Sequence, residues 1–471
     1  MDQEIEKKLT AWLEAHFEAL KADIKRVASI PSVSTYDEEG TPFGAGCKRA
    51  LEETLALAEK YGFETRNYEN RCGSVTLRPG RTEDEEIGFW GHLDVVPPGD
   101  DWRLTQPYAP IERDGFLIGR GVADNKGPSI GVMYLLRAFE ELRIPTRHGL
   151  RLFLGCDEEH GMEDVQYYAR NYPAQKLTLV ADCGFPACYA EKGIVEANIV
   201  SQKPMEAVAA IEAGMASNIV PDKAIITLRG EGSADVESEW ITVQRQGGQT
   251  CIRARGVSSH SAHPQGGVNA IHKAMEAALA TGLLTGTDAQ TIGFLKRVND
   301  DCLGTALGVD ARDEASGETT CAGTMASLRE DGRAVLHLNI RHCISAKEDE
   351  IFAAMEKACA ENGCVLERVR YSAPNYFPRE SPVVEALTAA YNEMTGAGSE
   401  PYVMGGGTYA RKLPNALGYG LGGVKSDSDT SIFENGHGGA HQPDEYLDLA
   451  SFKRALVIFG MGVLAADAAL E

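Results

Sequence analysis

The stretch Ile87-Gly-Phe-Trp-Gly-His-Leu-Asp-Val-Val-Pro97 decides the fold of this chain. Its apolar start predicts a short buried strand over residues 87–90, and the prolines that follow end the regular structure. A histidine at the carboxyl end of such a strand faces the ligand crevice of an α/β sheet, and His92 holds that place. Asp94 is positioned to accept the second imidazole proton of a metal-bound ring. Because one His-x-Asp pair is also common as a buried hydrogen bond, a metal site requires further ligands.

The pattern of an apolar strand that ends in an acidic residue recurs along the chain. Residues 116–118 lead to Asp124 and then to a helix over about 127–142, residues 150–155 lead to the acids at 157–159, and residues 177–181 lead to Asp182. Strands that alternate with helices at this spacing predict an α/β domain with a mostly parallel sheet and helices on both faces. The residues gathered at successive strand ends are His92, Asp124, Glu158, Glu159 and Asp182.

The residue pattern changes at about residue 191, which predicts a second domain. Half-exposed strands are expected at 194–200, 224–229, 240–245, 250–255 and 334–340, with helices at 268–281 and 348–362. This combination indicates an inserted α+β domain over 192–378, between two parts of the catalytic domain, 1–191 and 379–471. The second part is expected to contain a helix at 383–395, a glycine run at 405–407, a loop at 435–445 that carries His441, and a last helix at 449–466.

Composition narrows the possible partners and the compartment. The 471 residues include 46 Lys and Arg against 69 Asp and Glu, a net charge of -23 without a basic run, so we expect no nucleic acid and no membrane as partner. No apolar run reaches the ~18 residues of a membrane-spanning helix, and the charged N-terminal segment is not that of a signal peptide. Eleven scattered cysteines favour reduced thiols in a cytoplasmic protein. We expect a monomer or a weak homo-oligomer.

Two imidazoles and three carboxylates suit a pair of divalent metal ions. Imidazole with carboxylate favours Zn²⁺ and also admits Mn²⁺ or Co²⁺. Two such ions can share one hydroxide and polarise a carbonyl group. Glu158 is left over from the ligand set, and it is therefore the candidate general base that takes the water proton and delivers it to a leaving amine. The candidate ligands are His92 and Asp182 for one ion, His441 and Glu159 for the other, and Asp124 between them.

Five ordered motifs resemble the co-catalytic metallopeptidase family of aminoacylases, carnosinases and bacterial dipeptidases. They are Gly91-His-Leu-Asp-Val-Val-Pro97, Gly119-Arg-Gly-Val-Ala-Asp-Asn-Lys-Gly127, Asp157-Glu-Glu159 with Gly161, Asp182, and His441-Gln-Pro-Asp-Glu445. Three more stretches resemble its PepV and Sapep dipeptidase branch: Thr41-Pro-Phe-Gly44, Gly161-Met-Glu-Asp164 and Gly405-Gly-Gly-Thr-Tyr409. The resemblance covers nearly the whole chain. It implies a dipeptidase with two metal ions for peptides with a free C-terminal carboxylate. It also implies catalytic roles for Asp94, Glu158 and His260, and a cis bond between Asp124 and Asn125.

The same resemblance implies that the inserted domain is a lid that contacts the substrate. The motif at 256–269 aligns the substrate-contacting imidazole to His260 rather than His263. Two departures stand out, since His342 follows the expected arginine and the Lys425–Phe433 segment has no assignment. The residues implied in substrate binding are Asn218, His260, Arg341, Gly406 and Gly407.

Three other functions fit parts of the sequence. Gly127-Pro-Ser-Ile-Gly131 matches the G-x-S-x-G motif of serine hydrolases, with Asp429 and His441 in triad order, but Pro128 places the serine inside a helix start rather than on a strained elbow. A metal-binding protein that has lost turnover is disfavoured because Glu158 is present. An N-acyl-amino-acid deacylase would use the same metal centre, and it remains the alternative to the dipeptidase.

Overall fold

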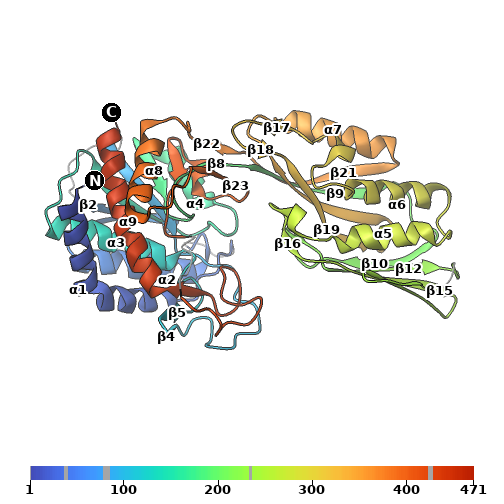
Figure 1. Cartoon of the computed structure of the whole chain (residues 1–471), viewed down its shortest axis with the longest axis horizontal. Helices are drawn as coiled ribbons and strands as arrows, with labels where there is room; N and C mark the ends of the chain where they lie inside the picture. Colours follow the sequence, from blue (N-terminus) through green and yellow to red (C-terminus); the bar gives the residue numbers. More distant parts are fainter. Residues whose placement is uncertain (1, 37–40, 78–84, 233–235, 423–427, 471) are drawn as a thin grey trace. The chain divides into compact units, whose positions relative to one another are not determined.

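The computed structural model describes residues 2–36, 41–77, 85–232, 236–422 and 428–470, and it divides into two compact units (Figure 1). The first unit comprises Met1–Ala190, Asn375–Val403 and Thr408–Glu471, and the second comprises Glu191–Pro374 and Met404–Gly407. The sequence had suggested an insertion at 192–378 and had left the glycine run in the catalytic part. The run groups with the second unit because Met404 O accepts from the Lys192 amide at 2.9 Å and Gly405 O accepts from Arg341 Nη1 at 2.9 Å.

The first unit is built on a mixed sheet whose centre is parallel. The four central strands β6 (Gly149–Gly155), β3 (Glu86–His92), β7 (Leu177–Val180) and β24 (Ala416–Gly418) run parallel to one another. Strands β1 (Glu64–Tyr68) and β2 (Cys72–Leu77) on one side, and β8 (Cys188–Glu191) on the other, pair antiparallel. The expected parallel sheet is therefore confirmed at the centre, where the candidate residues lie, and it is extended by antiparallel strands. Among the described residues the strand order is β1 (Glu64–Tyr68), β2 (Cys72–Leu77), β6 (Gly149–Gly155), β3 (Glu86–His92), β7 (Leu177–Val180), β24 (Ala416–Gly418), β8 (Cys188–Glu191) and β22 (Asn375–Tyr376), with β23 (Tyr402–Met404) beside β8.

Helices cover both faces of this sheet, as the sequence predicted. All seven residues of β3 are buried, as expected of a central parallel strand. On one face Phe89 meets Phe459 of α9, with 5.9 Å between the ring centroids. On the other face Trp90 contacts Tyr168 of α4 at 5.4 Å. The helices of this unit are α1 (Gln3–Ala28), α2 (Gly44–Lys60), α3 (Lys126–Glu141), α4 (Glu163–Asn171), α8 (Pro382–Thr395) and α9 (Leu449–Ala469).

Gly91 lets the start of α3 approach the end of β3. A Cβ atom added there would overlap the Ser129 hydroxyl and would lie 2.7 Å from Asn125 Oδ1. A residue with a side chain would therefore push the 124–126 turn away from the strand. This glycine keeps Asp124 close to His92. A three-stranded sheet contains β25 (Tyr446–Asp448), β5 (Phe116–Ile118) and β4 (Ile111–Arg113), in that order. Strand β25 directly follows the loop that carries His441.

The second unit is an antiparallel sheet with helices packed on it. Alternation is clear in β12, where Ala224, Ile226 and Leu228 are buried and the intervening residues are partly exposed. Helix α6 was not expected from the sequence. The strand order is β13 (Val236–Glu237), β14 (Ile241–Gln246), β15 (Gln249–Arg255), β12 (Lys223–Arg229), β10 (Val208–Ala213), β19 (Thr320–Leu328), β20 (Ala334–His342), β9 (Gly193–Ser201) and β21 (Cys364–Ser372), and the helices are α5 (Ala270–Ala280), α6 (Gly286–Val298) and α7 (Glu348–Glu361).

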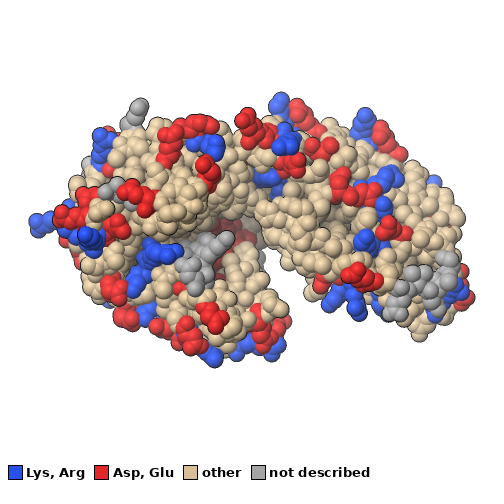
Figure 2. All heavy atoms as spheres, viewed as in Figure 1, with Lys and Arg blue, Asp and Glu red and all other residues tan. Residues whose placement is uncertain are grey.

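The charge pattern of the surface and the burial of the most apolar helix agree with the expectations drawn from composition. On the face drawn in Figure 2, Lys and Arg side chains are interspersed with Asp and Glu side chains, so the described residues of that face form no basic stripe. Among the described helices α9 alone is long and apolar enough to cross a membrane, and 72% of its apolar window is buried in the protein. It is thus a core helix of the first unit. Of the unassigned Lys425–Phe433 segment, residues 425–427 lie outside the described residues.

Candidate active site

The predicted metal ligands converge in the first unit around Asp124. Its carboxylate lies between two imidazoles: Oδ1 is 3.1 Å from His92 Nε2, and Oδ2 is 3.1 Å from His441 Nε2. The second imidazole is also 3.0 Å from Glu159 Oε1, and the first is 3.6 Å from Asp182 Oδ2. Elements far apart in sequence supply these groups, namely the end of β3, the turn before α3, the ends of β6 and β7, and the loop before β25. The arrangement matches a carboxylate that bridges two metal positions.

Glu158 lies within reach of the same cluster. Ligand atoms of His92, Glu158 and Asp182 lie within 4.8 Å of one another, and so do those of His92, Asp124 and Glu159. Both adjacent acids therefore face the predicted metal positions. Geometry alone leaves Glu158 able to act as a ligand or as a base.

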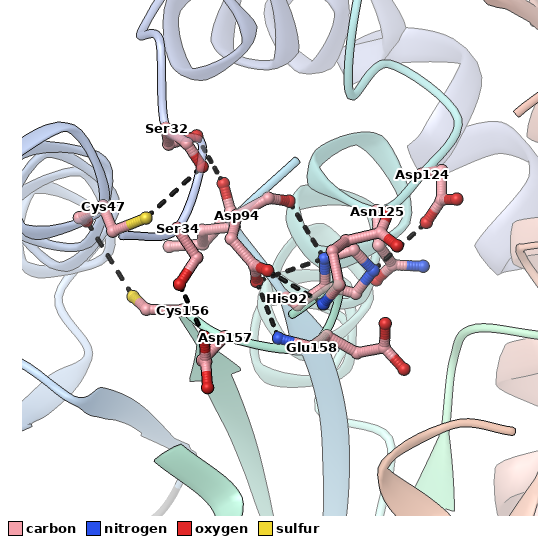
Figure 3. Close-up of polar contacts among 12 residues, drawn as sticks. Ser32, Ser34, Cys47, His92, Asp94, Asp124, Asn125, Cys156, Asp157 and Glu158 are labelled. Atoms are coloured by element: carbon pink, nitrogen blue, oxygen red, sulfur yellow. Dashed lines mark hydrogen bonds and ion pairs between the residues drawn. The ribbon is translucent and has the colours of Figure 1, made fainter. Parts of the chain in front are cut away.

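Asp94 connects the imidazole to the acidic pair. The backbone carbonyl of Asp94 is 3.0 Å from His92 Nδ1, and its carboxylate Oδ1 is 3.4 Å away, so the carbonyl is the nearer acceptor. The carboxylate accepts the backbone amides of Glu158 and Glu159 at 3.1 and 3.0 Å. Figure 3 shows the Glu158 side chain extending away from this amide contact. With Nδ1 bonded to the carbonyl, the Nε2 atom of His92 remains directed at Asp124.

Asn125 orients another ligand. Its amide nitrogen donates to Asp182 Oδ1 at 2.9 Å and to Ala181 O at 3.1 Å. The peptide bond between Asp124 and Asn125 is cis, as the family resemblance implied. Asp124 therefore contacts His92 directly, while the neighbouring Asn125 contacts Asp182.

The acids of the cluster carry more negative charge than the imidazoles balance. Burial and repulsion from Asp124 raise the pKa of Glu159 to about 7, and the same two causes raise the pKa of Asp182. Burial, together with repulsion from Asp182 and Glu159, raises the pKa of Glu158 well above its ordinary value. Hydrogen bonds with Asp124 and Glu159 raise the pKa of His441 to about 11. Divalent cations would relieve this repulsion among the acids, so the donor set fits metal binding.

Comparison with known proteins agrees with this geometry. The profile of peptidase family M20/M25/M40 matches residues 88–461. The chain belongs to this family. The family resemblance drawn from the motifs is thereby confirmed, and the protein is a peptide hydrolase.

Relatives match this peptidase over almost their whole length. It is 28% identical over 470 residues to "Putative dipeptidase YtjP" of Bacillus subtilis, which covers 95% of this chain and 96% of the relative. It shares its fold with human carnosine dipeptidase 1, at a TM-score of 0.58 and 14% identity over 98% of this chain and 99% of that one. The di-peptidase Dug1p of Saccharomyces cerevisiae has a TM-score of 0.60 and 13% identity over 99% of both chains.

The serine of the rival motif is not placed as a nucleophile in the peptidase. Ser129 is fully buried inside α3, and its hydroxyl donates to Asn125 Oδ1 at 3.3 Å and to His92 O at 3.4 Å. The histidine proposed for that triad, His441, instead contacts Asp124 and Glu159. The serine therefore supports the turn beside the cluster.

Sequence reasoning assigned no role to the buried pair of Arg120 and Glu445. Arg120 Nη1 donates to Glu445 Oε2 at 2.8 Å, while Glu445 Oε1 accepts the amides of Ala123 and Asp124 at 2.9 and 3.1 Å. The pair therefore ties the turn with the bridging carboxylate to the loop that carries His441. Both residues stand inside quoted motifs, but a motif does not say which atoms meet.

The predicted substrate-binding residues lie in the second unit and form a cluster of their own. His260, in β16 (Ser259–His260), pairs with Ile219 of β11 (Ile219–Val220), and the Ser261 amide donates to Asn218 O at 2.9 Å. Arg341 is 5% exposed, and its Nε donates to Asn339 Oδ1 at 2.8 Å. Its Nη1 donates to the backbone carbonyl of Gly405, the residue that directly precedes Gly406 and Gly407. The structure thus groups all of these residues within one unit.

Proposed function

We propose that this peptidase is a metal-dependent dipeptidase that cleaves dipeptides with a free C-terminal carboxylate. The observation that carries the proposal is the position of Asp124 between His92 and His441, with Asp182 and Glu159 beside them. In this assignment Asp124 would bind both of two divalent ions, His92 and Asp182 would bind one of them, and His441 and Glu159 would bind the other. The donor set favours Zn²⁺, with Mn²⁺ or Co²⁺ as substitutes.

Glu158 is the general base and acid of the proposed reaction. Bound divalent ions would acidify a water molecule and polarise the scissile carbonyl. Glu158 would take the water proton and deliver it to the leaving amine. Asp94 would keep Glu158 in position, because its carboxylate accepts a hydrogen bond from the Glu158 backbone amide at 3.1 Å.

The second unit would supply the groups that recognise a dipeptide. His260 would contact the carbonyl oxygen as it gains negative charge. Arg341, whose planar fork matches a carboxylate, would bind the free C-terminus with help from Asn218 and from the backbone at Gly406 and Gly407. Bonds to Asn339 and Gly405 hold the guanidinium in place before any ligand binds. The name of the relative from Bacillus subtilis supports the same substrate class.

The alternative is an N-acyl-amino-acid deacylase with the same metal ligands. Such an enzyme would also need an arginine for the free carboxylate, so the substrate decides between the two.

A substrate panel with controlled metal content tests the proposal. The purified peptidase is stripped with a chelator, its metal content is verified by mass spectrometry, and Zn²⁺, Mn²⁺ or Co²⁺ is added back before assay on dipeptides, tripeptides and N-acetyl amino acids. We expect no turnover without metal and the highest kcat/KM on dipeptides. Full activity in the verified metal-free protein would refute metal dependence. Faster cleavage of N-acetyl amino acids would identify the deacylase.

A further inference from the structure

Two buried carboxylates hold four successive backbone amides at the end of β6. Asp164 Oδ2 accepts the amides of Cys156 and Asp157 at 2.6 and 3.0 Å. Asp94 accepts the next two amides, those of Glu158 and Glu159. The conformation of this segment therefore depends on both carboxylates, and the segment carries the proposed base and a proposed metal ligand.

Tyr409 connects Asp164 to the imidazole on the neighbouring strand. Its hydroxyl donates a hydrogen bond to Asp164 Oδ2, the same oxygen that accepts the two amides. Its ring lies edge-on to Trp90 and to His92, with centroids 5.3 and 6.4 Å away. Tyr409 is 1% exposed and Asp164 is fully buried, so solvent does not offer these groups other partners. Tyr409 thus contacts both a proposed metal ligand, His92, and the acid that accepts the amides of Cys156 and Asp157, directly before Glu158.

Gly155 shows how closely this pair packs on the strand. A Cβ atom at that position would overlap the Tyr409 hydroxyl and would lie 2.5 Å from Asp164 Oδ2. The last residue of β6 therefore has no side chain, and the carboxylate and the phenol occupy that space. The glycine at the end of the strand is therefore required for Tyr409 and Asp164 to pack there.

We propose that Asp164 and Tyr409 are positioning residues. They fix the backbone at Cys156 and Asp157 and so orient the Glu158 and Glu159 side chains that follow, which affects both turnover and metal affinity. The inference rests on the proposed function. The Tyr409 hydroxyl fixes the Asp164 oxygen that accepts the Cys156 and Asp157 amides. If that oxygen shifts or is removed, the two amides must find other partners, and the segment that carries Glu158 and Glu159 would turn to do so. Neither residue needs to touch the substrate to have this effect.

Tyr409→Phe is the decisive variant, and Tyr168→Phe is its matched control. Tyr168 is also fully buried, its ring lies 5.4 Å from Trp90, and its hydroxyl accepts a hydrogen bond from Gln175. Each variant loses one buried hydroxyl from the same aromatic cluster. We expect Tyr409→Phe to lower kcat about ten- to a hundredfold with KM nearly unchanged, and to weaken Zn²⁺ binding in a chelator competition. The control should leave both quantities near the wild-type values.

A second variant keeps the test decisive if Tyr409→Phe does not fold. Asp164→Asn retains an oxygen acceptor and should keep more Zn²⁺ affinity and turnover than Asp164→Ala, with thermal unfolding recorded for each protein. Equal kcat and equal Zn²⁺ affinity in the Tyr409→Phe and Tyr168→Phe variants would overturn the proposal, as would no difference between the two Asp164 variants. The Zn²⁺ competition needs no substrate, so a wrong assignment of the dipeptide substrate would leave this result intact.

Discussion

Replacing Glu445 by alanine should destabilise the first unit strongly. The carboxylate is fully buried, and it accepts from Arg120 Nη1 at 2.8 Å and from the amides of Ala123 and Asp124 at 2.9 and 3.1 Å. Alanine would leave the Arg120 cation, which is 1% exposed, without its counter-charge, and it would leave two amides without their acceptor.

The size of the loss follows from these contacts. Removing one partner of a buried ion pair costs about 3–5 kcal/mol, because the remaining charge stays desolvated. Replacing both partners by apolar residues costs much less, so Arg120→Met combined with Glu445→Leu should recover a large part of the loss. Glu445→Gln keeps an oxygen for the amides but removes the charge. Its loss of unfolding free energy should fall between that of Glu445→Ala and that of the double variant.

Urea unfolding followed by tryptophan fluorescence measures this effect. The Arg120 guanidinium lies over the Trp102 ring, 5.4 Å from its centroid, so Trp102 reports on the pair directly. Three of the four tryptophans, Trp12, Trp90 and Trp102, belong to the first unit. A loss below about 1 kcal/mol for Glu445→Ala, or a double variant as unstable as the sum of its parts, would refute the reasoning.

Three further substitutions, Glu158→Gln, Glu159→Gln and Arg341→Ala, test the proposed roles, and a fourth, Gly462→Ala, tests the packing of the core. Glu158→Gln should keep the bound metal and lower kcat by about 10²–10⁴-fold, whereas Glu159→Gln should lower the metal content measured by mass spectrometry; the opposite pattern would exchange the two roles. Arg341→Ala should reduce kcat/KM on a dipeptide about ten- to a hundredfold and far less on its amide, and equal losses on both substrates would make the residue structural. Gly462→Ala should cost about 1–3 kcal/mol in thermal unfolding because its Cβ would lie 2.6 Å from the Tyr419 ring, and an unchanged melting temperature would contradict this packing.

Much of the catalytic framework could be predicted because its signals are local. An apolar run predicts a buried strand, and the polar residue at the end of that run can be read from the same stretch, as for His92 and Asp182. Parallel strand ends meet at one edge of a sheet, so residues far apart in sequence were expected to converge there. His441 follows no such strand, and the residues together with the closing motif suggested it as a ligand. Helix α6 escaped prediction because Gly286, Gly293 and its threonines weaken the apolar pattern of Gly286–Val298.

The sequence by itself determined the fold class, the candidate ligands and the presence of an inserted α+β unit. Only the tertiary structure showed which atoms hold those ligands in place. Asp164 and Tyr409 stand 245 residues apart, and no local periodicity relates a phenol to a carboxylate over that distance. The pairing of Glu445 with Arg120 is equally non-local. Such contacts depend on the complete packing of the core, because a buried charge or amide takes whichever partner the folded chain brings within hydrogen-bonding distance.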